Sequence, residues 1–516
     1  MNPEGLAPPA ALAPAALGWA GAGEPPPPMP VRYATAEYVG GRGGLPPVYE
    51  GRVLGGVEIG QSVSDAVAVG GRAALTVADL DLDNADGALD AIARFGLAVG
   101  RPVVLRAVPV RDRAASDFGT PLSGAETLFR GEIASVAALG AGARVSVADR
   151  AERLNVRLQA VRYLGEGGLE GRTELANRPK PISLGERFNV QPVYLGLVEF
   201  GDGALPTYQT HWREIAGHTA VRERGTPAAR VERKPLVGEW RDWPALGCFQ
   251  IGFTPDGDVT CDVRGDAPSQ AYADTVGGVL RRLLMSPGPA LKEADMDAAA
   301  WDAFENALPG AAGWGIGAED ATALEAAEQV LSACGAWLAG NRAGLVAPAL
   351  LGSPAAVPHF DLEDADLLAH AFEPVPAQLS PTPAAVEVGY RRNWSPSTNL
   401  REAVAGAERD ALSSPQQVAR SFSSVIASRG TPPRTLSLPS LFRDQADARR
   451  RADEVLAWLE RGLRVRVFTT DRYRNRIALG MTGEYRGGRY GPRWSGVVVG
   501  WRERSPACRV EIRMIG

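Results

Sequence analysis

Apolar and polar residues alternate at a period of two over short runs in the first third of the chain. The runs cover residues 31–33, 53–57, 103–105 and 143–148, and Gly, Pro or Asp bounds each of them. Along the last run, Val145 and Val147 fall on the same face of an extended chain. This pattern predicts short β-strands between residues 31 and 190.

Apolar residues recur at a helical spacing of three to four residues in four places. We predict a short helix after Asp86-Gly87 and longer helices over residues 269–285, 320–334 and about 448–463. The apolar positions that define them are Leu89, Ile92 and Phe95; Tyr272, Val276, Val279, Leu280, Leu283 and Leu284; Leu324, Ala327, Leu331 and Cys334; and Ala448, Ala452, Val455, Leu459 and Leu463. Gly462 lies where the last helix should end, and we expect it to cap that helix.

Strands are predicted again between and after these helices. Residues 336–339 and 345–346 flank a turn that Gly344 closes, which predicts a β-hairpin. After the last helix, Val465 and Val467 alternate with Arg464 and Arg466. The final strand has Val510, Ile512 and Met514 alternating with Arg509, Glu511 and Arg513, so we expect it to be half-exposed, at an edge of a sheet or on its outer wall.

Composition agrees with a chain of many short strands. Gly (60) and Pro (40) make up 100 of the 516 residues, about 19% against about 12% on average, which disfavours helical bundles. The length suggests about three or four domains. A net charge of −5 lacks the basic excess typical of nucleic-acid-binding proteins, so no sequence-specific nucleic-acid binding is expected.

The N-terminus is apolar without resembling a membrane segment. No charged residue occurs from Leu6 to Gly23, but three prolines interrupt this stretch and Glu4 precedes it. A secretory signal peptide has the opposite features, so we favour an extended arm over residues 1–30, with a signal peptide as the alternative. Four prolines at 25–28 would make a stiff spacer, and no membrane span is expected.

The acidic run from Asp79 to Gly87 has some features of a calcium loop. A loop that starts at Asp81 would need an oxygen ligand at its fifth position and Gly at its sixth, where Ala85 and Asp86 stand. Leu80 and Leu82 alternate with aspartates, as in a half-buried strand that leads into a turn. We therefore predict a strand and a turn, with a metal site as the alternative.

Residues that carry catalysis or bind metals are sparse. The histidines His211, His218, His359 and His370 and the cysteines Cys248, Cys261, Cys334 and Cys508 have no spacing typical of zinc sites. No nucleophile elbow, Walker loop or dinucleotide fingerprint is present, and the glycines at 165–168 are not followed by the Lys-Ser/Thr of a phosphate loop. No residue is therefore assigned a catalytic, cofactor-binding or metal-binding role, and no cofactor is expected.

A catalytic carboxylate pair is compatible with 60 acidic residues, and tryptophans could line a sugar groove. The tryptophans considered for such a groove are Trp212, Trp240, Trp243, Trp301, Trp314, Trp394, Trp494 and Trp501. Tryptophans like these more often belong to cores or interfaces. A β-rich hydrolase of cell-wall or capsule glycans, or a carbohydrate-binding adhesin, is the alternative function.

A series of motifs resembles the tail-tip hub proteins of long-tailed bacteriophages. Phe129-Arg130-Gly131-Glu132-Ile133 leads into Val145-Ser146-Val147 and Asp149-Arg150. Further pieces, in chain order, lie at 80–90, 100–103, 163–171, 177–181, 185, 189–192, 257–265, 335–337, 341–345, 390–394 and 455–456. Their order and spacing over residues 31–516 carry the resemblance.

The resemblance implies a mainly β, multidomain fold with α+β insertions. Its parts would be a Pro/Ala-rich arm (1–30), a first β-barrel-like hub domain (31–190), an α+β middle region (191–384) and a second β-barrel-like hub domain with one helix (385–516). It implies a non-enzymatic structural protein that forms a homotrimeric ring at the distal end of the tail, in the virion, after synthesis in the host cytoplasm.

The same resemblance implies the function of that ring and its partners. In the family, two barrel-like domains per subunit give a pseudo-sixfold ring, which joins a hexameric tail tube to threefold tip or fibre proteins around an axial channel for genome ejection. The partners would be the distal tail protein, the tape-measure protein, and tail tip, spike or fibre proteins that serve host attachment. The chain ends soon after the last β domain, so receptor binding would belong to another chain.

Overall fold

The computed structural model describes residues 32, 38–39, 48–55, 57–63, 73–77, 79–95, 99–107, 125–201, 203–429, 433–487, 493–504 and 509–516. The fold is mainly β, with helices inserted between groups of strands, which confirms the predicted class. The predicted arm (1–30) and, apart from Arg32, the strand predicted at 31–33 lie outside the described residues. The chain forms two compact units, one of residues 1–59, 77–148 and 504–507, the other of residues 60–76, 149–503 and 508–516.

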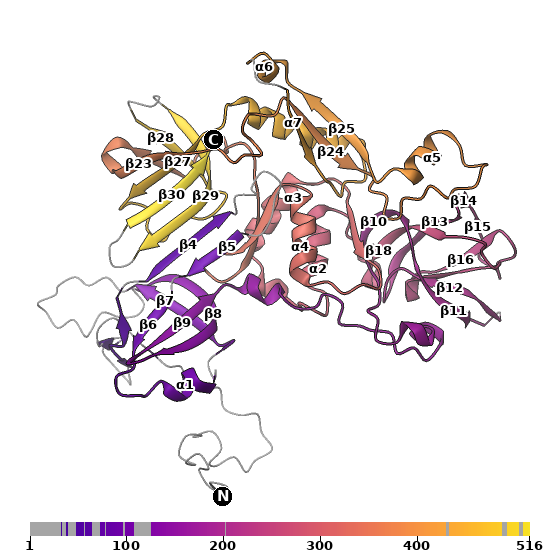
Figure 1. Cartoon of the computed structure of the whole chain (residues 1–516), viewed down its shortest axis with the longest axis horizontal. Helices are drawn as coiled ribbons and strands as arrows, with labels where there is room; N and C mark the ends of the chain where they lie inside the picture. The colour runs from indigo at the N-terminus through magenta and orange to yellow at the C-terminus, as the bar shows by residue number, and fades with distance from the viewer. Residues whose placement is uncertain are drawn as a thin grey trace, which may run out of the picture. The chain divides into compact units, whose positions relative to one another are not determined.

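The first unit contains a five-stranded antiparallel sheet. Its strands, in spatial order, are β3 (Val53–Leu54), β6 (Leu80–Asp83), β9 (Gly142–Ala148), β8 (Glu126–Leu139) and β7 (Pro102–Ala107) (Figure 1). The short strands β1 (Tyr38–Val39) and β2 (Val48–Tyr49) pair with each other. Val145 and Val147 are both buried, so the face predicted for β9 is confirmed.

Two predictions in this unit need correction at their boundaries. The strand expected over 53–57 ends at Leu54, because Gly55 has a left-handed φ of 76° that turns the chain out of the sheet. The helix expected after Gly87 is α1 (Asp90–Phe95), so Leu89 precedes it; Leu89 is nevertheless buried.

The second unit begins with two five-stranded sheets that share a core. One contains β14 (Thr226–Pro227), β13 (Ile215–Glu223), β18 (Val259–Asp266), β10 (Ile182–Val190) and β19 (Gly313–Ile316). The other contains β11 (Val193–Glu199), β12 (Ala204–Gln209), β17 (Cys248–Ile251), β16 (Glu239–Trp243) and β15 (Ala229–Arg230). Side chains of both sheets, among them Tyr208, Trp240, Phe249 and Val263, form one buried cluster, as in a β-sandwich.

Helices and a hairpin follow the sandwich. They are α2 (Val276–Leu284), α3 (Ala298–Ala307), α4 (Ala323–Ser332), β20 (Ala336–Gly340) and β21 (Val346–Leu350). The hairpin is confirmed, with antiparallel pairing and a left-handed Gly344 in its turn. The helix predicted from residue 269 begins only at Val276, because Ser269 and Gln270 have left-handed φ values of 54° and 66° and cannot continue a helix.

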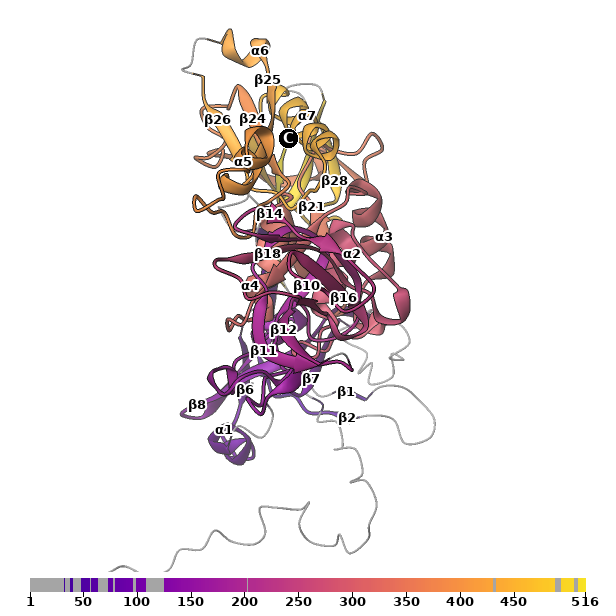
Figure 2. The ribbon, with the colours of Figure 1, turned by 90° about the vertical axis from the view of Figure 1, so that its right-hand side faces the viewer.

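A three-stranded sheet with a covering helix comes next. Strand β24 (Ala385–Tyr390) lies between β25 (Gln417–Phe422) and β26 (Thr435–Leu438) (Figure 2). It is antiparallel to β25 and parallel to β26. Helix α7 (Gln445–Glu460) packs on β24 and β25, and α5 (Gly406–Ser413) and α6 (Ser424–Ala427) lie in the connections. Gly462, with a φ of 76°, follows α7 and donates to the carbonyl of Leu459, which confirms the predicted cap.

The last sheet curls toward a barrel. Its main path is β22 (Phe360–Glu363), β28 (Thr482–Arg486), β29 (Trp494–Arg504), β30 (Arg509–Ile515), β27 (Val465–Thr470) and β23 (Leu367–Glu373); β4 (Glu58–Val63) joins β29 and β5 (Ala73–Val77). The end strands β22 and β23 are joined by only three residues, Asp364–Asp366, so the two ends of the sheet must approach each other. The ring centroids of His370 on β23 and Tyr485 on β28 lie 5.4 Å apart.

The position of the final strand resolves the two predicted options. Val510, Ile512 and Met514 are fully buried and the intervening residues face outward, as predicted. However, β30 lies between β29 and β27, so it belongs to the outer wall and not to an edge. The alternation expected along β27 is wrong at Arg466, which is 1% exposed because it shares the inner face with Phe468.

Candidate functional site

Both histidines of the sandwich are satisfied core residues. His211 is 1% exposed, and its Nδ1 accepts a hydrogen bond from the Ser183 amide (3.1 Å), so the proton lies on Nε2 and is donated to Asp266 (3.0 Å). Burial lowers the pKa of His211 although Asp266 raises it. Burial also raises the pKa of Asp266, but hydrogen bonds from His211 and Arg213 outweigh this and hold it below its ordinary value.

His218 lies in an arrangement that resembles a catalytic triad. Its Nδ1 is 2.7 Å from Asp242 Oδ1 and its Nε2 is 2.9 Å from Thr210 Oγ1. Thr210 and His218 are each 1% exposed, and neither lines the pocket described below. A substrate has no access to Thr210 in this conformation, so the triad links strands across the core and supplies no nucleophile.

The remaining histidines and the cysteines, to which the sequence assigned no role, have the following surroundings. His359 accepts a hydrogen bond from the Thr482 amide (2.9 Å), and His370 stacks on Phe468 with 4.7 Å between ring centroids. Cys248, Cys261 and Cys334 are buried free thiols, whereas Cys508 lies outside the described residues. Burial raises the pKa of Cys334 to about 12, so this thiol stays protonated.

The acidic run that suggested calcium forms a strand and a turn. Leu80 and Leu82 are buried on β6, which confirms the half-buried strand. Asp86 receives two hydrogen bonds from the guanidinium of Arg52, at 2.9 and 2.6 Å, and Asp81 is paired with Arg144. Among the described residues, no group of three or more His, Cys, Asp or Glu side chains is arranged to hold a metal ion.

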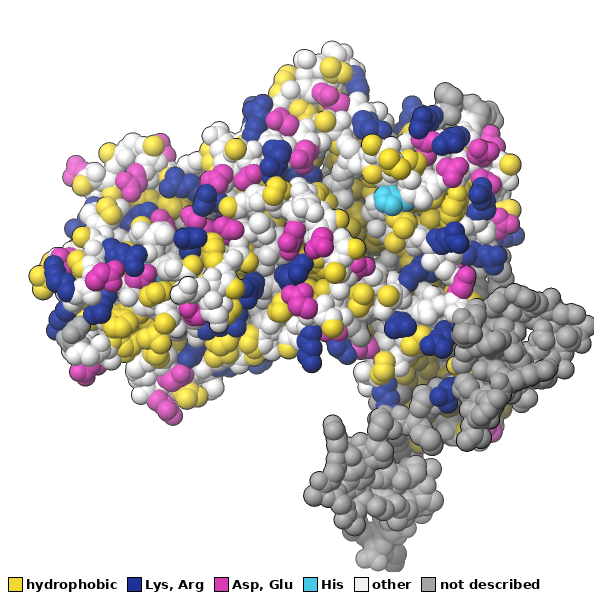
Figure 3. Space-filling view, turned by 180° about the vertical axis from the view of Figure 1, so that it is seen from behind, with side chains coloured by type: hydrophobic (Ala, Val, Ile, Leu, Met, Phe, Trp, Pro, Cys, Tyr) yellow, Lys and Arg dark blue, Asp and Glu magenta, His cyan; other side chains and the backbone are white. Residues whose placement is uncertain are grey.

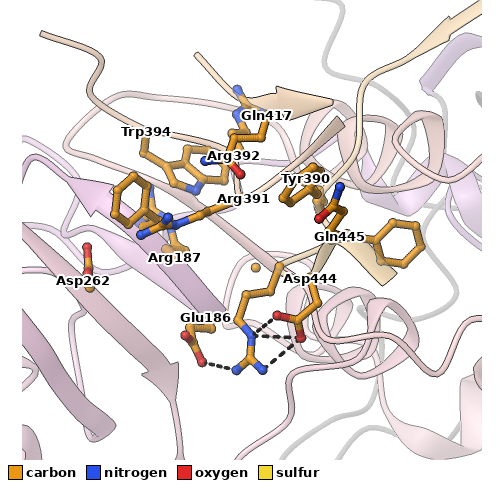
Figure 4. A pocket seen from close by; sticks show the side chains of 15 residues that line it. Glu186, Arg187, Asp262, Tyr390, Arg391, Arg392, Trp394, Gln417, Asp444 and Gln445 are labelled. Atoms are coloured by element: carbon orange, nitrogen blue, oxygen red, sulfur yellow. Dashed lines mark hydrogen bonds and ion pairs between the residues drawn. The ribbon is translucent and has the colours of Figure 1, made fainter. Parts of the chain in front are cut away.

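A pocket in the second unit lies between β10 and the segments that flank β24 and α7. Its volume is about 430 Å³. We call it the arginine pocket, because Arg187, Arg391, Arg392 and Arg443 line it together with Trp394. Figure 4 shows Arg187, Arg391 and Arg392 close to Trp394 on one side, and Glu186 and Asp444 together on another.

Arg187 is the buried member of this group. It projects from β10, is 5% exposed, and donates from Nη1 to Ser183 Oγ (2.8 Å). Gly315, on the neighbouring strand β19, leaves the room for its guanidinium, since a Cβ there would lie 2.4 Å from Nη1. The pKa of Arg187 is lowered to about 9, mainly by burial and also by the nearby charge of Arg392.

The segment after β24 covers Arg187. Arg391 has a left-handed φ of 47°, and its amide donates to the carbonyl of Phe442 (2.8 Å), so the chain turns at this point toward β10. Trp394 then donates from its amide to the carbonyl of Phe188. The centroid of its ring lies 4.3 Å from the guanidinium carbon of Arg187 and 4.2 Å from that of Arg392.

The carboxylates of the pocket are already engaged. Arg443 donates to Glu186 (2.8 Å) and to Asp444 (2.9 Å). Asp262 receives two hydrogen bonds of 2.7 Å from Arg222. A glycosidase needs one carboxylic acid that can donate a proton and one free carboxylate, and arginine pairing disfavours the protonated form. The pocket is therefore suited to bind anions and not to cleave glycosidic bonds.

The tryptophans considered for a sugar groove lie in cores or under arginines; the guanidinium groups of Arg213, Arg241 and Arg466 lie over Trp212, Trp243 and Trp494, respectively. Trp240, Trp301, Trp314 and Trp501 are buried in cores, and Trp394 stacks on arginines. Arg187, Arg391 and Arg392 were not predicted from the sequence as site residues. The Arg391-Arg392-Asn393-Trp394 run is the signal that could have suggested the last two, since arginines beside a tryptophan often stack on it.

Comparisons with known proteins give only distant likenesses. No model of a protein family matches the chain, and no curated protein matches it. A chain in the virion of a native gene transfer agent particle is 12% identical, over 66% of this chain and 84% of that one, with a TM-score of 0.43.

Two tail proteins also align. The tail protein from Neisseria meningitidis MC58 is 12% identical, over 65% of this chain and 91% of that one, with a TM-score of 0.28. The 43 kDa tail protein of prophage MuSo2 from Shewanella oneidensis is 9% identical, over 91% and 95%, with a TM-score of 0.31. These solved structures are virion and tail proteins, but at such scores the likeness does not assign this chain to a family.

Proposed function

We propose that this chain is a structural, non-enzymatic component of a bacteriophage tail tip, a baseplate hub. Three copies form a ring that closes or extends the tail tube and joins its sixfold symmetry to threefold tip or fibre proteins. The axial channel of the ring lets the genome pass during ejection. The distal tail protein, the tape-measure protein and the tip, spike or fibre proteins are its partners in the virion, at the distal end of the tail.

The ordered motifs of the sequence support this proposal. They extend from Leu80 to Leu456 and include the segment around Trp394 that docks onto β10. Two observations support its non-enzymatic part: the carboxylates of the arginine pocket are paired with arginines, and His218 of the triad-like arrangement is buried. In the part of the chain that the structure describes, no helix is both long and apolar enough to cross a membrane.

The observation that carries the proposal is a pair of sheets that end in exposed apolar strands. Strand β23 ends the barrel-like sheet, and Leu368 and Phe372 on it are 55% and 47% exposed. Strand β25 ends the three-stranded sheet, and Phe422 is 55% exposed there. An exposed charge, Arg420, also lies on β25, but neighbouring subunits in a ring would cover the apolar side chains of both strands.

On the face shown in Figure 3, basic and acidic side chains are interspersed with apolar ones. Mixed charge of this kind keeps a protein soluble without favouring nucleic acid, which suits the wall of a channel that DNA passes without binding.

Mass photometry of the full chain tests the proposal, with electron microscopy of tail particles. We expect a species of three copies that forms a ring with an axial hole. Leu368→Glu together with Phe422→Glu should shift the population to monomers, because each change places a charge at a covered edge. Val237→Glu, at an 84% exposed position in a loop of the sandwich, is the matched control and should leave the trimer intact. Monomers at all concentrations, with no ring in particles, would refute the proposed hub.

A further inference from the structure

Three arginines of the arginine pocket have no carboxylate partner. Arg187 bonds only a serine hydroxyl, Arg391 lies 4.2 Å from the ring centroid of Phe188, and Arg392 lies over Trp394. The three acidic residues of the lining are bound to Arg443 and to Arg222, as described above. The pocket therefore carries an excess of positive charge that no described side chain neutralises.

Burial makes this excess costly. Arg187 is 5% exposed and its Nε has no hydrogen-bond partner, so the folded chain holds a desolvated cation without a counter-charge. Removing a charge from water is unfavourable unless an opposite charge or hydrogen bonds compensate it. An anion placed against Arg391 and Arg392 would supply that compensation within the same pocket.

The N-terminus of α7, which has the acidic residue Asp447 in its first turn, also borders the pocket. This helix has 16 residues, begins at Gln445, and its N-cap residue Asp444 makes no side-chain hydrogen bond to the helix. Gln445 and Asp444 both line the pocket (Figure 4). The free N–H groups and the macrodipole of a helix N-terminus favour anions.

We propose that the arginine pocket binds a small anion that carries two or more carboxylate or phosphate groups. Arg391 and Arg392 bind its oxygens directly, Arg187 supports it through charge, and Trp394 holds the two stacked guanidinium groups in place. A volume of about 430 Å³ exceeds what one ion fills and lies in the range of small-ligand sites. This site goes beyond the proposed structural role, which stands without it.

Isothermal titration of the full chain with citrate and with pyrophosphate, at constant ionic strength, tests this site. Both anions should bind with a stoichiometry of one per chain. Arg392→Gln should weaken binding at least about tenfold, the loss expected for one charge-assisted hydrogen bond. Arg420→Gln is the matched control, because Arg420 is an exposed arginine on β25 that pairs with Glu387 outside the pocket, and it should change affinity by less than about twofold.

A third titrant identifies the source of the anion. A tri-aspartate peptide that binds, with the same loss in Arg392→Gln, supports a carboxylate presented by another protein chain, whereas binding of citrate or pyrophosphate alone supports a free ligand. Arg187 is buried, so Arg187→Gln can prevent folding. The exposed Arg392 is therefore the residue whose replacement tests the site. No binding of any titrant, or equal weakening by Arg420→Gln, overturns the proposal. Because the trimer is measured separately, failure here leaves the proposed hub untouched.

Discussion

Replacement of Asp266 by Asn should weaken the sandwich more than any change to an exposed ion pair. The side chain of Asp266 is 1% exposed and accepts three hydrogen bonds, from Arg213 at 2.6 and 2.8 Å and from His211 at 3.0 Å. The carboxamide that Asp266→Asn introduces would keep the shape of the side chain but lose its negative charge. Its NH₂ group would face the N–H donors of Arg213 or His211. One buried donor would then lack an acceptor.

The expected cost is about 3 kcal/mol, at the lower end for a broken buried ion pair, because Arg213 is about one-third exposed and can be rehydrated. Asp256→Asn is the control: Asp256 pairs with Arg401 at 3.1 Å but is 64% exposed, so its loss should cost less than about 1 kcal/mol. Both variants remove one carboxylate that is paired with arginine, and they differ mainly in burial.

Hydrogen exchange of the native protein is the suitable assay, because it reports the stability of the strands around Asp266 separately from that of the rest of the chain. Amides of β10, β13 and β18 report the local stability around Asp266. A loss of about 3 kcal/mol corresponds to roughly 100-fold faster exchange there. An increase of less than about tenfold, or one equal to that of Asp256→Asn, would refute the view that this buried network stabilises the sandwich.

Individual buried residues give three further predictions. The pKa of His211 is lowered in the folded chain, so between that pKa and about 6.5 only the unfolded chain binds the proton. Stability measured by urea titration should therefore fall from pH 7.5 to 5.5, and should fall less in His211→Asn. An equal dependence of stability on pH in both proteins would contradict this. Gly185→Ala would place a Cβ 2.0 Å from a backbone oxygen at a φ of 62°, so it should lower the free energy of unfolding by more than about 2 kcal/mol. Gly168→Ala, at a φ of 57° but in open space, should lower it by about 1 kcal/mol. Similar melting temperatures of the two variants would refute the clash. Trp301→Ala removes a fully buried indole and should cost about 3–5 kcal/mol in urea unfolding, against less than about 0.5 kcal/mol for the 60% exposed Leu236→Ala.

Local signals in the sequence determined several elements well. The start of α4 depends on Thr322 and Glu325, which form a capping box only three residues apart, and the predicted helix is confirmed with a difference of a few residues at each end. The hairpin of β20 and β21 depends on a turn that needs Gly344 at a left-handed φ. In each case the physical cause lies in neighbouring residues, so the sequence alone reveals it.

The arginine pocket and the curled sheet depend on contacts of the tertiary structure that the sequence does not reveal. Arg187 alternates with apolar residues on a strand, a pattern that predicts exposure, yet Gly315 makes room for it and Trp394 covers it from a segment about 200 residues away. Likewise, β22 and β23 are close in sequence, and only their pairing with β28 and β27 makes them the two ends of one sheet. Contacts between distant segments depend on topology, which local periodicity does not encode.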